Sequence, residues 1–180
     1  RVLFLYSAMN KNITHELKYL RGLLKGSKKL TRLKRGWKKS YLIKVLAVYL
    51  FLDLALNLLI GFPLVTLLED YYNTYEEFTE SPLELILLGA IIVPIIEELM
   101  FRAPMTLAKR NIRSTYVLFW LLTSLFALLH ISNYDFNTIP LWAYPIMVIP
   151  QFITGILLGM VRIRFGLRYS MILHGSFNFL

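Results

Sequence analysis

Residues 91–104 read IIVPIIEELMFRAP and place two glutamates and an arginine inside an apolar stretch. A charged side chain in hydrocarbon costs about 2.5–3.5 kcal/mol or more, so such residues usually mark a function. Glu98 and Arg102 stand four residues apart and can pair along one face of a helix. Glu97 points about 100° away from that face and can meet a neighbouring helix. Pro94 cannot donate a backbone hydrogen bond, so we expect a kink near it.

A structural ion pair that locks two helices together would explain a single Glu–Arg pair in a membrane helix. The additional glutamate favours a chemical role instead. Arg102 can hold Glu98 charged and occupied, while Glu97 stays available as a base.

Apolar blocks of membrane-spanning length surround this stretch. The apolar fraction is 57% and the mean hydropathy is +0.56. A bilayer core of about 30 Å needs about 20 helical residues, and an open sheet cannot satisfy its backbone in lipid. We therefore expect an all-α fold, a polytopic transmembrane helical bundle. Its spans, at least five in number, are Val45–Leu68, Leu85–Ala108, Tyr116–Ile131, Leu141–Val161 and a last one from Tyr169 onward.

The charges between the spans alternate in sign. Thirteen of the twenty lysines and arginines lie in residues 1–44, whereas residues 69–84 hold six acids and no basic residue. The loops at 109–113 and 162–168 are basic again. By the positive-inside rule, the N-terminal segment and both basic loops should be cytoplasmic. We predict a multi-pass integral membrane protein with a basic cytoplasmic or interfacial segment (1–44) and a membrane-embedded domain (45–180).

The N-terminal segment has the pattern of a basic helix lying in the membrane interface. Within residues 13–35, lysines and arginines surround one apolar face, formed by Ile13, Leu17, Leu20, Leu23 and Leu24. Membrane lipids are therefore the expected partner of this segment. The net charge of +9 does not indicate nucleic acid, because no nucleic-acid-binding motif accompanies the cluster. The sequence identifies no protein partner.

Two further spans contain groups suited to acid–base chemistry. The stretch FALLH ends at His130, with Phe126 one turn before it, and HGSFN places His174 and Asn178 on one helical face. Gly175 would allow another helix to approach closely. A lone histidine in an apolar helix is usually a packing residue, but three spans that each bring polar groups favour a catalytic site. The chain has no cysteine, so a thiolate nucleophile is excluded.

These motifs also resemble those of a known family. EELMFR resembles EExxxR, FALLH resembles FxxxH and HGSFN resembles HxxxN. In order and helix placement they are similar to the CPBP family of intramembrane proteases (CAAX protease and bacteriocin-processing, or Abi). The resemblance covers about residues 45–180, and the ordered set is more specific than any one motif.

The resemblance implies a glutamate-dependent endopeptidase that cleaves a membrane-associated or prenylated peptide or protein near the cytoplasmic face. Carried over onto this sequence, Glu97 would activate water as the general base with help from His130. His174 and Asn178 would stabilise the oxyanion. Bacteriocin precursors and bacteriocin self-immunity are further roles that the resemblance allows.

The resemblance also implies that Glu98 and Arg102 would orient the other residues of the site. We expect no cofactor, because the HExxH arrangement of a zinc peptidase is absent. Zinc held by Glu97, His130 and His174 is the alternative, since two histidines and a glutamate suit that ion.

Two other functions remain open from the sequence. A binding or assembly subunit could keep the fold without turnover, and a proton or ion carrier could use Asp53, Glu97 and Glu98.

The candidate site residues are expected at different depths in the membrane. Counted from the cytoplasmic ends of their helices, Glu97 lies about 16 Å deep, His130 about 21 Å and His174 about 9 Å. Tilted helices, or a later start to the third span, would bring the three side chains level.

Overall fold

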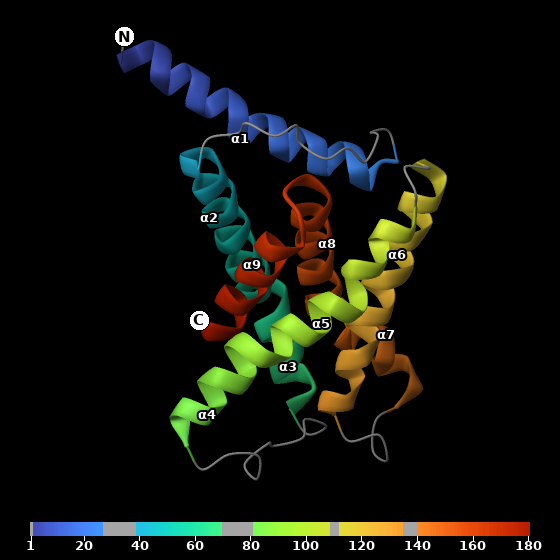
Figure 1. The fold of residues 1–180 in the computed structure, drawn as a ribbon. Coiled ribbons are helices and arrows are strands. Elements are labelled where there is room, and N and C mark those ends of the chain that lie inside the picture. The colour runs from blue at the N-terminus through green and yellow to red at the C-terminus, as the bar shows by residue number, and fades with distance from the viewer. Residues whose placement is uncertain (1, 27–38, 70–80, 109–111, 135–139) are drawn as a thin grey trace.

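The computed structural model describes residues 2–26, 39–69, 81–108, 112–134 and 140–180. Every element named within these ranges is helical, which confirms the all-α class. The longer helices form a bundle, and the N-terminal helix lies across one end of it (Figure 1).

Three helical stretches are long and apolar enough to cross a membrane, namely Lys39–Leu64, Arg113–Asn133 and Leu141–Arg164. Their elements are α2 (Lys39–Leu56), the π-helix η1 (Asn57–Gly61), α3 (Phe62–Leu67), α6 (Ile112–Leu129), the 3-10 helices η5 (His130–Asn133) and η6 (Leu141–Ala143), α7 (Tyr144–Met147) and α8 (Ile149–Arg164). Apolar side chains on the outer faces of these helices are exposed, as expected of residues that face lipid. Phe51 is 70% exposed and Leu59 is 72% exposed.

The predicted second and fifth spans are helical but are not among these three. The second is divided into four elements, α4 (Pro82–Ile86), the π-helix η3 (Leu87–Ile92), α5 (Val93–Phe101) and the 3-10 helix η4 (Ala103–Ala108). The last helix, α9 (Leu167–Phe179), has 13 residues. The run from α4 to α5 crosses the bundle obliquely, and α9 is also tilted (Figure 1). Five complete spans therefore stay a prediction, of which three are supported.

Close helix packing rests on glycines at three contacts. A Cβ on Gly159 would lie 2.7 Å from the Phe119 ring, and one on Gly155 would lie 3.1 Å from Phe126, so both glycines of α8 let α6 approach. A Cβ on Gly175 would lie only 2.4 Å from the carbonyl oxygen of Ala90, where α9 meets η3. The close approach predicted for Gly175 is thus present.

The N-terminal helix α1 (Val2–Leu24) buries only part of the apolar face that its leucines indicated. Tyr19 and Leu23 are buried against the bundle, whereas Leu17 is 39% exposed and Leu24 is 50% exposed. The predicted single apolar face is therefore divided between the bundle and the surroundings. The part of the predicted basic helix at 27–35 lies outside the described residues, and its place in the interface stays a prediction.

A buried ion pair joins α1 to the last turn of α8. Arg164 donates from Nε to Glu16 Oε2 at 2.8 Å and from Nη2 to Glu16 Oε1 at 2.5 Å, and Tyr41 donates its hydroxyl to Oε1 at 2.7 Å. Burial opposes the charge on Glu16, but the hydrogen bonds from Arg164 and Tyr41 and the charge of Arg164 outweigh it and lower the pKa of Glu16 below its ordinary value. This contact fixes α1 on the bundle.

Candidate active site

The local fold of α5 explains where its two glutamates point. The π-helix η3 ends directly before Val93 and Pro94, and α5 then runs through the EELMF sequence. Glu98 is fully buried, whereas Glu97 is partly accessible. The two neighbours are therefore separated by helical direction, as the sequence predicts.

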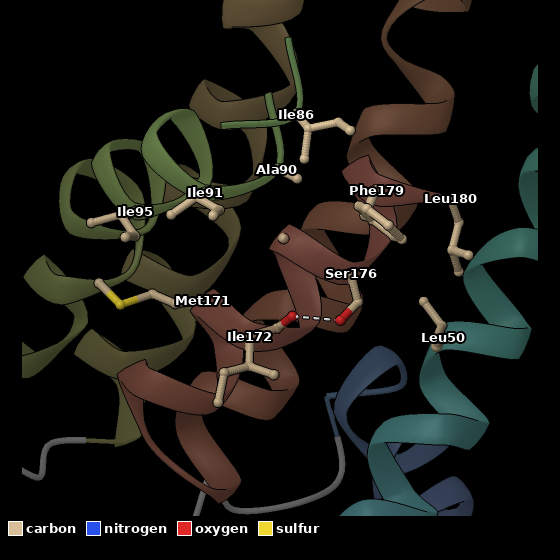
Figure 2. A pocket seen from close by; sticks show the side chains of 11 residues that line it. Leu50, Ile86, Ala90, Ile91, Ile95, Met171, Ile172, Ser176, Phe179 and Leu180 are labelled. Carbon is tan, nitrogen blue, oxygen red and sulfur yellow. Dashed lines mark hydrogen bonds between the residues drawn. The ribbon is translucent and has the colours of Figure 1, made fainter. Parts of the chain in front are cut away.

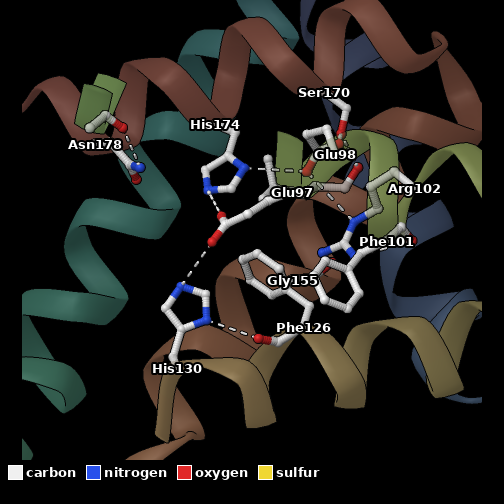
Figure 3. Close-up of polar contacts among 12 residues, drawn as sticks. Glu97, Glu98, Phe101, Arg102, Phe126, His130, Gly155, Ser170, His174 and Asn178 are labelled. Atoms are coloured by element: carbon white, nitrogen blue, oxygen red, sulfur yellow. Dashed lines mark hydrogen bonds and ion pairs between the residues drawn. The ribbon is translucent and has the colours of Figure 1, made fainter. Parts of the chain in front are cut away.

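Glu97 lies between two histidines from different helices (Figure 3). Its Oε1 is 3.9 Å from Nε2 of His130, and its Oε2 is 3.4 Å from Nε2 of His174. The tilt of α5 and α9 brings these three side chains together although their sequence depths differ. One carboxylate thus has two imidazoles beside it, which are the side chains that general acid–base catalysis uses most often.

The orientation of His130 is set by its own helix. Its Nδ1 lies 2.8 Å from the carbonyl oxygen of Phe126, one turn earlier. A carbonyl can only accept, so Nδ1 carries a hydrogen and Nε2 is the atom presented to Glu97. The Phe126 ring packs edge-on against both His130 and His174.

Glu98 is buried among polar groups that do not fully satisfy it. Its Oε1 lies 3.4 Å from His174 Nδ1 and 3.8 Å from Arg102 Nε, while the Ser170 hydroxyl contacts Oε2. Glu98 Oε1, Arg102 Nε and His174 Nδ1 are buried without a hydrogen bond. Ser170 was not selected from the sequence, although it precedes His174 by one helical turn and so shares its face.

Arg102 has partners besides Glu98. It donates from Nη2 to the carbonyl of Gly155 at 3.2 Å, and its guanidinium lies 4.7 Å from the centre of the Phe126 ring. Its backbone carbonyl accepts from Arg162 Nε at 3.0 Å. Arg102 is therefore fixed by α6 and α8 as well as by α5. Nothing in the sequence pointed to Gly155 or Arg162 as its partners.

Asn178 lies further along α9 and bonds to the backbone of η3 rather than to the glutamates (Figure 3). Val93 donates its N–H to Leu88, five residues back, and Pro94, next in this register, has no N–H to give to Gly89. Asn178 Nδ2 donates to that Gly89 carbonyl at 2.9 Å. The asparagine thus compensates for the proline and helps hold α9, with His174, against α5.

A polar cavity of about 330 Å³ lies beside the two histidines. Asn178 lines it, so the cavity brings together His130, His174 and Asn178. Its other described lining residues are Asp53, Asn57, Asn133, Gln151, Thr154 and Phe177. Of these the sequence drew attention only to Asp53, as a residue of a possible carrier.

An apolar groove of about 640 Å³ lies between α2, η3, α5 and α9 (Figure 2). Leu50, Ile91 and Ile95 line it together with Met171 and Phe179. Its size falls within the usual range of about 300–1,000 Å³ for a ligand pocket.

Within the described residues, no group of three or more histidine, aspartate or glutamate side chains has the arrangement of a metal site. Whether Glu97, His130 and His174 bind zinc is decided by chelation of the active protein.

The apolar helices are those of an integral membrane protein, and Glu97, Glu98 and Arg102 lie together in one polar site inside the bundle. Residues 79–180 match a family model described as "Type II CAAX prenyl endopeptidase Rce1-like". The match covers more than half of the chain and contains every motif residue. The chain therefore belongs to the Rce1-like type II CAAX prenyl endopeptidase family, which is the CPBP family that the motifs resemble. No curated protein and no solved structure matches the chain.

Proposed function

We propose that this protein is an intramembrane endopeptidase in which Glu97 activates water to hydrolyse a peptide bond. The observation that carries the proposal is the position of Glu97 between two imidazoles, at 3.4 Å from His174 and 3.9 Å from His130. Membership of a protease family supports the same reaction class.

The reaction balances with groups that are present in the site. Glu97 takes a proton from water, and the water oxygen forms a bond to the carbonyl carbon of the substrate. His174 and Asn178 stabilise the negative charge that develops on the carbonyl oxygen. The C–N bond then breaks as its nitrogen receives the proton from Glu97. His130 orients Glu97 and the water through Nε2.

Glu98 and Arg102 act as positioning residues in this proposal. Glu98 contacts His174 on the side opposite Glu97, and Arg102 anchors Glu98 to α8 through Gly155. The second glutamate and the arginine therefore hold the imidazole that faces the reaction.

The proposed substrate is a membrane-associated peptide or protein that carries a prenyl chain. The apolar groove beside α9 supports this class, because Ala90 and Gly175 line it next to the site helices and its other walls are almost entirely aliphatic or aromatic (Figure 2). A prenyl chain is an apolar ligand of suitable size for such a groove.

A non-catalytic assembly or bacteriocin-immunity role is the second candidate function. The unsatisfied buried atoms of Glu98, Arg102 and His174 argue against it, since a purely structural site would be expected to satisfy them. Turnover decides between the two functions.

The proposal is tested with purified protein and a quenched fluorescent peptide that ends in a farnesylated CaaX sequence. Glu97→Gln should lower the cleavage rate by about 10²–10⁴-fold with little change in melting temperature, because it removes the base without changing volume. Glu84→Gln is the matched control, since Glu84 is exposed on the same helical run and should leave cleavage unchanged. Full activity in Glu97→Gln would contradict the proposed role.

The same assay tests the zinc alternative. We expect cleavage to persist after chelation and the active preparation to lack stoichiometric zinc. Activity lost on chelation and restored by Zn²⁺ would assign the metal to Glu97, His130 and His174 instead.

We also propose that α1 and the basic loops face the cytoplasm, as the charge distribution indicates. A cysteine introduced at Ser132, which is exposed near the opposite end of α6, should react with an impermeant maleimide from outside intact cells. Labelling of Ser132→Cys only after cell lysis would reverse the orientation. Cleavage near the cytoplasmic face stays a prediction from the family resemblance.

A further inference from the structure

Three polar side chains form a hydrogen-bonded group that the proposed reaction does not use. Thr154 donates its hydroxyl to Asp53 Oδ1 at 2.6 Å, and Asn57 donates from Nδ2 to Asp53 Oδ2 at 3.1 Å. Asp53 and Thr154 are buried, at 4% and 6% exposed, so the group is enclosed between α2 and α8. Both carboxylate oxygens of Asp53 are occupied, which fixes the side-chain amide of Asn57.

The backbone fixes Asn57 from the other side. The π-helix η1 begins at this residue, and a Cβ on Gly61 would lie 2.9 Å from Asn57 Oδ1. The absence of a side chain at Gly61 therefore makes the space that the Asn57 amide occupies. An amide held this firmly is pre-organised to bind a ligand.

Asn57 stands in the wall shared by two adjacent cavities. The first, of about 330 Å³, contains His130 and His174, and the second, of about 200 Å³, continues toward Gly61 and Met147. Both are lined by Asn57, His130, Asn133 and Gln151. A path lined with amides thus runs past the two histidines toward α3 and α7.

The chemistry of this path suits a polypeptide main chain. Asn133 and Gln151 carry neutral amides, a group that both donates and accepts hydrogen bonds. The Nδ2 of Asn57 already donates to Asp53, so its Oδ1 is the atom that can accept from a ligand. Each residue of an extended peptide likewise offers one donor and one acceptor. The carboxylate of Asp53 is almost inaccessible and already engaged, so the described lining offers no open charge for an ion. The groove lined by Leu50, Ile91 and Ile95 is aliphatic, in contrast to this polar path.

We propose that this path is the subsite for the peptide part of the substrate, where Asn57 and Gln151 hydrogen-bond its main chain. Asp53 and Thr154 are positioning residues that hold the Asn57 amide. The inference rests on the proposed function, because it assigns a subsite to the substrate of that reaction.

The subsite lies toward one end of the bundle. Gln151 lies in the first turn of α8, whereas Arg164, 13 positions later at its last turn, contacts α1, and this separation spans about 20 Å. The path lined with amides therefore lies at the α3–α7 end, away from α1 (Figure 1).

Protection from labelling tests the subsite without using turnover. The chain has no cysteine, so a single introduced thiol reports one position. Asn133→Cys lines the path, and Ser132→Cys beside it does not. In the Glu97→Gln background, the farnesylated CaaX peptide should slow maleimide labelling of Asn133→Cys at least fivefold and leave Ser132→Cys unchanged. Equal rates with and without peptide at Asn133→Cys would overturn the subsite.

Kinetics provide a second, independent measurement. Asn57→Ala and Gln151→Ala should each raise KM about five- to tenfold with kcat nearly unchanged, as expected for one lost hydrogen bond. Thr154→Val should do the same by releasing Asp53, whereas Thr154→Ser should restore wild-type KM. Thr66→Val is the control, because its hydroxyl bonds only Phe62 of its own helix among the contacts described.

The two measurements separate failure of the subsite from failure of the protease assignment. Normal cleavage with unchanged KM in Asn57→Ala and Gln151→Ala would reject the subsite and leave the protease assignment intact. Protection at Asn133→Cys without any cleavage by the wild-type protein would keep a peptide-binding subsite and reject the protease.

Discussion

The part of the chain that the structure describes contains two buried glutamate–arginine pairs whose geometry differs sharply. Glu16 and Arg164 meet through two direct hydrogen bonds, and Tyr41 supplies a third to the same carboxylate. Glu98 and Arg102 remain 3.8 Å apart, with an unpaired atom on each side. The first pair fixes α1 to α8, and the second lies in the candidate active site.

The difference indicates what each pair is for. A buried ion pair stabilises only when its geometry is good and its remaining polar atoms are bonded, and Glu16–Arg164 meets that condition. Glu98–Arg102 does not, because Glu98 is also drawn toward His174 and Ser170. Incomplete bonding is costly in a buried network and persists mainly where function requires it.

The largest expected effect on stability comes from breaking the satisfied pair. Arg164→Met leaves Glu16 buried without its guanidinium partner, so the free energy of unfolding should fall by about 3–5 kcal/mol. Thermal melting in detergent measures this loss. The double variant Glu16→Leu with Arg164→Met removes both charges and should recover most of the stability. An unchanged melting temperature in Arg164→Met would show that the Glu16–Arg164 contact does not stabilise the folded protein.

Breaking the unsatisfied pair should affect activity more than stability. Glu98→Gln should lower cleavage by about 10²-fold, because His174 loses the carboxylate that positions it. The stability loss should be only about 1–3 kcal/mol, since Arg102 keeps its contacts to Gly155 and Phe126. Cleavage rate and melting temperature are measured on the same preparation. A larger stability loss than in Arg164→Met, with activity intact, would reverse the comparison.

The smallest expected effect is the pH dependence of the Glu16 contact. The pKa of Glu16 is lowered in the folded protein, so the stabilisation is present above the ordinary glutamate value and is lost as pH falls through the folded-state value. Wild type should therefore be more stable than Glu16→Gln near neutral pH, and the difference should shrink as the pH falls below the ordinary glutamate value. A difference in melting temperature that does not change with pH would contradict the assignment.

The sequence by itself determined the helical class and the local geometry of each motif. Four-residue spacing puts Glu98 beside Arg102, and the same spacing lets His130 bond the Phe126 carbonyl. The direction of Glu97 also follows from helical periodicity. These relations are local, so a regular helix imposes them before any packing occurs.

Other features were decided only by the tertiary structure. The sequence depths of Glu97, His130 and His174 did not match, yet in the bundle, where α5 and α9 are tilted, both imidazoles lie within 4 Å of the Glu97 carboxylate. The bond from Asn178 to Gly89 exists because Pro94 frees a carbonyl that a second helix happens to reach.

The N-terminal helix shows the same division. Its leucine pattern predicted one apolar face, yet Glu16 is buried on α1 because Arg164 lies 148 residues away in sequence and directly opposite in space. Periodicity states which residues share a face of one helix. It does not state which face another helix covers, how far the helices tilt, or which distant partner makes a buried charge stable, because those depend on contacts between segments far apart in the chain.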